Sequence, residues 1–422
     1  MRYFKSARTA LKQLTHYFSA SLIPMMLNLL INPLVSLNMD PKDFAIVGYF
    51  NSFSTLISPI IMFYMLHYYN KRYFELDEAG REHLRALLYK ALIFFSFCIA
   101  ITCVLVLSIY VKCTVMEFNT FPYLYIAVMT IPFSGIYGLE LADYKMKRNS
   151  GAYLYLSLFK GIGVVLLTLL LVVILKWGAT GKLLSPFILE VVVFIYLLIK
   201  HKDIWRVKTS LKELFPVLKF CWPLVIGAAL GYFSNGYDKT LLESLGNVDD
   251  FGYYCVGVSI AAYLSVFTSS ISSTFQPDTY EAIIHDNKSK LYKVVSVRFG
   301  LTLIVVLLFV LLCPLIVKIL TAGKYMPAVP YARIAAFIPL TSSLYYVIND
   351  YSIAKDKPQF YLITTILGSL LIILMMPIFI NKLSYSGGAL MNVLSFIILI
   401  CINWLLLLFD KLKVWFGRKY KD

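Results

Sequence analysis

The sequence predicts an all-α polytopic membrane protein of about twelve transmembrane helices, in two six-helix lobes related by a pseudo-twofold axis along the membrane normal. Three observations predict this fold: an apolar composition, a series of spanning-length apolar runs, and an internal repeat. Of 422 residues, 59% are hydrophobic and 15% are charged, and the mean hydropathy is +0.75. A soluble chain of this length needs more charge to cover its surface in water, so part of this chain must face lipid.

The apolar runs have about the ~20 residues that a helix needs to cross a bilayer. They fall near 17–37, 44–66, 90–111, 122–140, 153–175, 183–200, 220–242, 251–274, 296–317, 331–353, 360–380 and 386–409. The first and the seventh are interrupted by prolines, at Pro24, Pro33 and Pro223.

The distribution of lysine and arginine predicts the orientation. With the N-terminus in the cytoplasm, 29 of the 39 basic residues fall in cytoplasmic segments, nine fall outside, and Lys160 lies within a span. The positive-inside rule therefore places both ends in the cytoplasm. The net charge of +16 is explained by topology, and no helix-turn-helix, RNP or zinc-finger pattern indicates nucleic-acid binding.

The two halves of the chain match weakly at one offset. Asp43 matches Asp250 and Pro132 matches Pro339, since both pairs are 207 residues apart. Six spans per repeat is an even number, which predicts parallel repeats around an axis along the membrane normal, as in transporters. The predicted domains are an N-terminal lobe, a cytoplasmic linker, a C-terminal lobe and a basic cytoplasmic tail, at 1–200, 201–219, 220–409 and 410–422.

Polar residues within the spans are candidates for a binding site. Asn28 and Asn32 share a face of span 1, Asn51 lies in span 2, and Tyr263 lies in span 8. A polar stripe on a spanning helix faces either a neighbouring helix or water. Two interpretations stay open: hydrogen bonds between helices, or a hydrated substrate cavity lined by spans 1, 2, 7 and 8.

Charged residues within spans are fewer. Lys160 lies about seven residues into span 5, and Glu190 is near the middle of span 6. A lone carboxylate there costs several kcal/mol unless it is paired or protonated. Lys160 is predicted to bind an anionic substrate, unless it extends to the cytoplasmic surface. Glu190 is predicted to couple transport to an ion, unless it forms a structural ion pair with Lys160.

Three further charges lie at the ends of spans. Arg298 and Arg333 open spans 9 and 10 and are candidates for a second substrate-binding cation, with interfacial anchoring as the alternative. Asp238 is the second candidate for ion coupling; the alternative is a surface cluster with Lys239 and Glu243.

No catalytic motif is present. The sequence has no GxSxG, Walker A or HExxH motif and no metal-ligand spacing. We therefore expect no enzymatic activity, no metal site and no bound cofactor. Net transport against a gradient would need H⁺ or Na⁺ as a coupling ion.

From span 7 onwards the sequence resembles the polysaccharide transporter family. The resemblance rests on segments with a proline, an acidic–basic pair and a glycine–aromatic entry to span 8. These segments are 223–227 (PLVIG), 235–239 (NGYDK), 248–254 (VDDFGYY), 275–277 (FQP), 320–325 (LTAGKY) and 328–330 (AVP). Near the N-terminus, 41–45 (PKDFA) fills a similar role, with alanine where glycine is common. Lys239 stands where the family often has arginine.

The resemblance implies a flippase that moves undecaprenyl-diphosphate-linked oligosaccharide repeat units across the bacterial cytoplasmic membrane. Its implied context is O-antigen, capsule or exopolysaccharide synthesis, with other polysaccharide assembly proteins as partners. The arginines that peptidoglycan-precursor flippases carry in spans 1 and 2 are absent here, which argues against that substrate. A multidrug extruder of the same superfamily is the first alternative. A membrane glycan polymerase or ligase is the second, although those enzymes typically carry a large outer loop.

Overall fold

The computed structural model describes the backbone of residues 2–114, 118–354 and 359–419. Within these residues every regular element is helical. The side chains of residues 1–14, of 409–422 and of several positions within 273–284 and 349–359 lie outside the described part. The predicted tail and the Gln276–Pro277 segment of the family resemblance are among them.

The chain forms two compact units. The first comprises Met1–Ala229 with Leu320–Ala322, and the second comprises Leu230–Ile319 with Gly323–Asp422. The boundary falls at the end of one helix, so that the helix at 211–230 belongs almost entirely to the first unit. The pseudo-twofold relation between two six-helix lobes stays a prediction.

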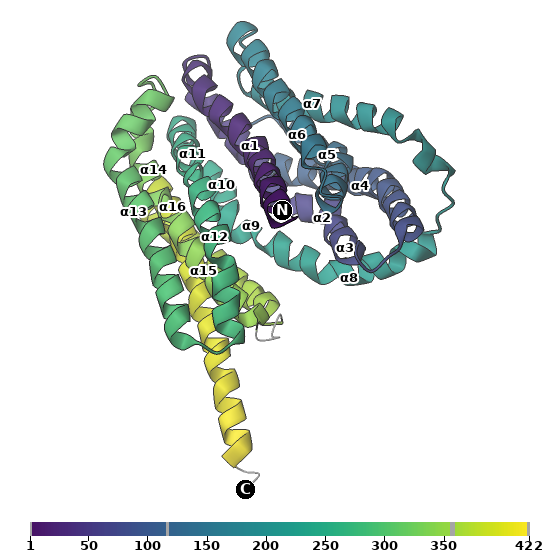
Figure 1. The fold of residues 1–422 in the computed structure, drawn as a ribbon. Coiled ribbons are helices and arrows are strands. Elements are labelled where there is room, and N and C mark those ends of the chain that lie inside the picture. The colour runs from purple at the N-terminus through teal and green to yellow at the C-terminus, as the bar shows by residue number, and fades with distance from the viewer. Residues whose placement is uncertain (1, 115–117, 355–358, 420–422) are drawn as a thin grey trace. The chain divides into compact units, whose positions relative to one another are not determined.

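The first unit is a helical bundle. Its elements are α1 (Arg2–Leu37), α2 (Pro41–Met62), α3 (Met65–Arg72), α4 (Glu78–Thr114), α5 (Tyr123–Met146), α6 (Ser150–Thr168), the π-helical turn η1 (Leu169–Ile174), α7 (Gly178–Lys200), the 3₁₀ turn η2 (Lys202–Arg206) and α8 (Leu211–Leu230). α1 and α6 pack side by side, and α5 packs against α2, α4 and α7 (Figure 1). Helices that are not adjacent in sequence therefore line the same interior.

The second unit is also a helical bundle. Its elements are α9 (Tyr232–Asn235), α10 (Tyr237–Leu242), the 3₁₀ turn η3 (Glu243–Leu245), α11 (Val248–Ala262), α12 (Leu264–Ile284), α13 (Lys288–Leu320), the 3₁₀ turn η4 (Met326–Ala328), α14 (Val329–Ala335), α15 (Ile338–Ala354) and α16 (Gln359–Lys419). α15 packs against α12 and α16, and α11 packs against α14.

The apolar segments are helices of spanning length. Among the described residues, ten helices are long and apolar enough to cross a membrane. The last of these, Phe360–Leu408, covers two predicted runs and is interrupted at Ser384, where φ is 49° and ψ is −134°. The predicted run at 331–353 is divided between α14 and the 17-residue α15. The total of twelve spans stays a prediction.

Several predicted spans are not single straight helices. α2 ends one turn after Pro59, and Phe63 and Tyr64 both adopt left-handed backbone angles before α3 begins. The seventh run is divided into α8, α9 and α10, with Gly236 at φ −152° between the last two. Such breaks expose backbone groups that need partners, so they belong inside the protein rather than against lipid.

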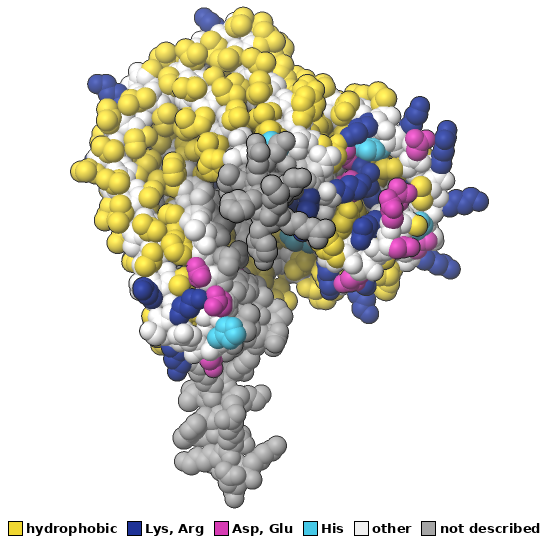
Figure 2. Space-filling view, viewed as in Figure 1, with side chains coloured by type: hydrophobic (Ala, Val, Ile, Leu, Met, Phe, Trp, Pro, Cys, Tyr) yellow, Lys and Arg dark blue, Asp and Glu magenta, His cyan; other side chains and the backbone are white. Residues whose placement is uncertain are grey.

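Much of the exposed surface of the long helices is apolar. Figure 2 shows hydrophobic side chains over wide areas of the visible face, with most of the visible charged side chains gathered in two regions. Leu105, Ile109, Leu311 and Leu312 are among the exposed hydrophobic residues of the long helices. Contiguous apolar surface of this extent is stable only in lipid, so the chain is a multi-pass membrane protein.

Candidate functional site

The first unit contains a cavity of about 740 Å³. α2 contributes Asn51, Thr55 and Ser58, which lie on one face because they are four and three residues apart. α5 contributes Thr130 and Ser134 to the same cavity. The predicted polar stripe of span 2 therefore faces a cavity, and not only a neighbouring helix.

The charged wall of this cavity comes from α7. Lys182, Pro186 and Glu190 line it and are four residues apart along the helix. At a rise of about 1.5 Å per residue, the two charged residues are ~12 Å apart in depth. The cavity thus has a lysine towards one end and a glutamate towards the other.

Glu190 forms an ion pair with Lys160, which was one of the two interpretations of its position in the sequence. Lys160 Nζ, on α6, contacts Glu190 Oε1, and the ammonium lies 3.9 Å from the centroid of the Tyr137 ring. Glu190 is buried, and its second oxygen, Oε2, has no hydrogen-bond partner among the described residues. The pair satisfies half of the carboxylate and leaves the other half able to take a proton or a ligand.

Lys182 lines the cavity, although the sequence predicted it to lie in a loop outside the spans. The predicted span began at 183, but α7 begins at Gly178, whose φ is +49°. The Ala179 amide donates to Asp43 Oδ1 at 2.9 Å, and a carboxylate stabilises a helix N-terminus there. This cap holds the first turns of α7 in place, so Lys182 lines the cavity. Its ammonium has no hydrogen-bond or ion-pair partner among the described residues.

The predicted asparagines of span 1 have other partners. Asn28 Nδ2 donates to the Pro24 carbonyl of its own helix at 2.9 Å. Asn32 Nδ2 donates at 2.8 Å to the carbonyl of Leu320, a residue of the same compact unit. Neither asparagine lines the cavity of the first unit. The Asn32 bond agrees with the interpretation of hydrogen bonds between helices, whereas Asn28 bonds within its own helix. A role of either asparagine in substrate binding stays a prediction.

The second unit contains a separate cavity of about 430 Å³. Arg298, on α13, lines it and is only 3% exposed. Its Nη2 donates to Ser272 Oγ at 2.8 Å and to the Ser343 carbonyl at 3.3 Å. Its Nε and Nη1 groups have no acceptor among the described residues. Arg298 is thus a buried cation at a cavity rather than an interfacial anchor.

The remaining predicted site residues of the second unit lie apart from this cavity. Asp238, on α10, is completely buried; it accepts a hydrogen bond from the Tyr254 hydroxyl, and its Oδ1 has no partner among the described residues. Glu243 is buried as well, so the surface-cluster interpretation is wrong for both acids. Arg333 is exposed on α14, and Tyr263 lies at the break between α11 and α12. Neither lines the Arg298 cavity.

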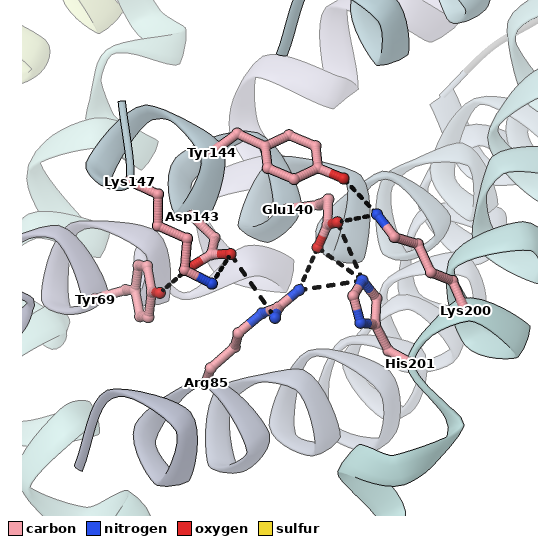
Figure 3. A network of polar contacts seen from close by, with 8 residues as sticks. All are labelled: Tyr69, Arg85, Glu140, Asp143, Tyr144, Lys147, Lys200 and His201. Carbon is pink, nitrogen blue, oxygen red and sulfur yellow. Dashed lines mark hydrogen bonds and ion pairs between the residues drawn. The ribbon is translucent and has the colours of Figure 1, made fainter. Parts of the chain in front are cut away.

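A buried network of charges connects four helices of the first unit (Figure 3). Glu140, on α5, accepts from Arg85 of α4, from Lys200 of α7 at 2.8 Å and from His201 at 3.0 Å. Asp143, one turn later, accepts from Lys147 at 2.8 Å and from Tyr69 of α3 at 2.6 Å. Burial and this last hydrogen bond hold the pKa of Tyr69 well above its usual range. Both carboxylates have several donors, so this cluster is a structural connection rather than an open ligand site.

The network also joins segments that the sequence predicts on one side of the membrane. Tyr69, Lys147 and His201 meet there; they lie after the second, fourth and sixth predicted spans, where the positive-inside rule places the chain in the cytoplasm. Leu88, Leu92, Leu139, Val193 and Leu197, from three of the helices that the network joins, belong to one apolar core. The described residues contain no group of three or more His, Cys, Asp or Glu side chains able to hold a metal ion.

Comparison with known proteins settles the family. The family described as polysaccharide biosynthesis protein matches residues 10–277, which is more than half of the chain. The chain belongs to this family. No curated protein sequence matches it.

Solved structures of transporters share the fold of this polysaccharide biosynthesis protein. An inward-facing multidrug resistance MATE transporter of the MOP superfamily is 14% identical, with a TM-score of 0.69 over 93% of this chain and 97% of that one. The lipid II flippase MurJ, in an inward closed conformation, is 14% identical, with a TM-score of 0.67 over 93% and 87%. A MOP superfamily transporter from Pyrococcus furiosus is 13% identical, with a TM-score of 0.63 over 93% and 95%. These neighbours are transporters and a flippase, not enzymes, and at such identities they show the fold alone.

Two features were not predicted from the sequence: the cavity position of Lys182 and the buried charge network around Glu140. The sequence prediction left Lys182 in an outer loop, because it began the span at 183, five residues after the start of α7 at Gly178. Glu140 is the last residue of a predicted span. Arg85 entered the sequence analysis only as one of the basic residues that predict the orientation in the membrane. An acid within an apolar run was the available signal for Glu140, but the helices that supply its partners are not adjacent in the chain.

Proposed function

We propose that the protein is a flippase that translocates undecaprenyl-diphosphate-linked oligosaccharide repeat units across the bacterial cytoplasmic membrane. The product would serve O-antigen, capsule or exopolysaccharide synthesis. One observation carries the proposal: a lysine without a partner among the described residues lines a hydroxyl-rich cavity inside an apolar bundle. A polysaccharide biosynthesis protein with the fold of lipid and drug exporters needs such a cavity for a polar, anionic headgroup.

The chemistry that the first unit offers matches such a headgroup. A diphosphate is attracted by a cation more strongly inside a cavity than in water, because the local dielectric is lower. Lys182 supplies that cation, as a point charge that does not require bidentate geometry. Lys160 lies deeper and is the second basic group, after release from Glu190. The amide of Asn51 and the hydroxyls of Thr55 and Ser58 supply hydrogen bonds for sugars.

Arg298 and Arg333 remain candidates for further anion contacts, and Asn28, Asn32 and Tyr263 for sugar contacts, in the same proposal. Glu190 is the proposed coupling group, with H⁺ or Na⁺ as the ion, because its Oε2 has no partner among the described residues and lies at the cavity. Asp238 is the second candidate, because its buried Oδ1 also has no hydrogen-bond partner among the described residues. Both termini are proposed to be cytoplasmic, from the positive-inside distribution.

A multidrug extruder is the second candidate function. The unpartnered carboxylate oxygen of Glu190 favours it, because a cationic drug needs an acidic group in the cavity. The shared fold does not separate the two functions, since both an extruder and a flippase are among the neighbours.

The two functions are separated by a transport experiment on the purified protein in proteoliposomes. Flipping of a fluorescent lipid-linked oligosaccharide is measured in one arm and uptake of ethidium in the other. The proposed function predicts flipping without ethidium uptake. Ethidium uptake without flipping would establish the extruder instead. Accumulation of a defined lipid-linked repeat unit in a deletion strain then identifies the glycan.

A further inference from the structure

The Arg298 cavity of the second unit has the composition of a ligand site. Arg298 is the basic residue among its lining side chains, and α12 and α15 surround it with hydroxyl groups. A buried guanidinium is costly unless its N–H groups find acceptors. Two of its three nitrogens lack an acceptor among the described residues, so an acceptor from a ligand would stabilise this arrangement.

The hydroxyl groups of the cavity act mainly as acceptors. Ser342 donates to the Pro339 carbonyl, Ser343 to the Leu340 carbonyl, and Ser269 to the Val266 carbonyl, at 3.2, 2.8 and 2.9 Å. A hydroxyl that has used its hydrogen still has lone pairs to accept with. Such groups bind a ligand that donates hydrogen bonds, as a sugar does with its hydroxyls. They do not bind an oxyanion, which only accepts.

The charge of the cavity limits the ligand to a weakly charged anion. Asp350 lines the same cavity as Arg298 and offsets part of its positive charge. A group with two or more negative charges is repelled by Asp350 more strongly than a single carboxylate is. The cavity therefore favours a carboxylate over a diphosphate.

We propose that the cavity around Arg298, between α12, α13 and α15, is a specificity subsite for an acidic sugar. The sugar carboxylate accepts from Nε and Nη1 of Arg298, and its hydroxyls donate to the serine oxygens of α12 and α15. Ser272 holds the guanidinium in position through its hydrogen bond from Nη2. This inference rests on the proposed function, because it identifies the class of glycan that the flippase selects: repeat units with a uronic acid.

Binding of soluble sugars to the purified full-length protein tests the subsite without a transport step. Glucuronate, glucose, glucose 1-phosphate and inorganic pyrophosphate are titrated against the wild type by calorimetry. Glucuronate is expected to bind at least about tenfold more tightly than glucose, which corresponds to ~1.4 kcal/mol. Tighter binding of pyrophosphate or glucose 1-phosphate than of glucuronate would assign the site to the phosphate end of the lipid and overturn the proposal.

Variants locate the binding within the cavity. Arg298→Gln is expected to weaken glucuronate binding about tenfold or more. The exposed Lys318→Gln, on the same helix and with the same change in charge, is expected to leave it unchanged. If Arg298→Gln does not fold, Arg298→Lys and Ser272→Ala replace it, and both should weaken glucuronate binding while glucose binding stays the same. Undiminished glucuronate binding in these folded variants would refute the subsite.

The outcome is separable from the proposed function. A protein that flips lipid-linked oligosaccharide but does not bind glucuronate would retain the function and lose the subsite. A protein that binds glucuronate through Arg298 but flips no lipid-linked oligosaccharide would retain the subsite and lose the function.

Discussion

The ammonium of Lys160 is paired with Oε1 of Glu190, and the second oxygen of that carboxylate is buried without a partner among the described residues. The pair joins α6 to α7 at a depth where an isolated charge would be costly. The two residues therefore depend on each other for stability, and any change of charge on Glu190 also affects Lys160.

Removal of one partner of this pair should destabilise the protein more than removal of both. Lys160→Met and Glu190→Gln each leave one polar group buried and unpaired, and breaking a buried pair typically costs ~3–5 kcal/mol. The double variant should recover much of this loss. Thermal unfolding in detergent measures the coupling. The exposed pair of Arg72 and Glu75 serves as the control, with an expected coupling of ~0.2–1 kcal/mol. Additive losses at Lys160 and Glu190 would contradict the ion pair.

Glu190→Gln also tests ion coupling. If Glu190 carries the coupling proton, the folded variant should still bind substrate but lose the pH dependence of flipping in proteoliposomes. If Glu190 serves only as the partner of Lys160, the folded fraction should fall, and the pH profile of the remaining activity should not change. A stable variant with unchanged flipping and an unchanged pH profile would defeat both roles.

Lys182 should be needed for flipping. Lys182→Gln removes the cavity cation that has no partner among the described residues, and flipping of the lipid-linked oligosaccharide should fall about tenfold or more. Lys182→Arg keeps the charge and should retain part of the rate. Lys176→Gln is the matched control, since Lys176 is exposed just before α7 and does not line the cavity. Equal rates in Lys182→Gln and Lys176→Gln would exclude Lys182 from the site.

Glu140 should contribute more to stability than an exposed acid does. Glu140→Gln removes the only acidic partner that the described residues give Lys200 and His201 in this buried cluster, and leaves Arg85 with Asp143 alone at 3.7 Å. The expected cost is ~3–5 kcal/mol. Glu213→Gln removes an exposed partner of His83 and should cost less than ~1 kcal/mol. Thermal unfolding of both variants measures the difference. Similar melting temperatures would show that the network is dispensable.

Gly161 should be intolerant of a side chain. A Cβ at this position would lie 2.6 Å from Pro24 Cβ, so Gly161→Ala must push α1 away from α6. Overpacking of this kind typically costs ~1–3 kcal/mol. Gly300→Ala, within α13, meets no atom within 4 Å and should be neutral or slightly stabilising. The two melting temperatures test this contact, and a tolerated Gly161→Ala would show that the helices can separate without loss.

The sequence alone determined the class of protein and the approximate position of its helices. Apolar runs, lysine and arginine counts and prolines are local features, and the bilayer imposes helical structure on any apolar segment of spanning length. The similar depths of Lys160 and Glu190 in the membrane could also be read from the sequence. They made an ion pair between these two sequential helices one of the predicted arrangements.

Only the tertiary structure decided which polar groups share a cavity. The sequence made Asn28 a binding candidate and left Lys182 outside the spans, yet Asn28 bonds to its own helix while Lys182 lines the cavity. That difference depends on the cap from Asp43 to Ala179, which joins positions 136 residues apart. A local pattern shows which side chains share a face of a helix. The neighbour that this face meets depends on the packing of helices that are distant in sequence.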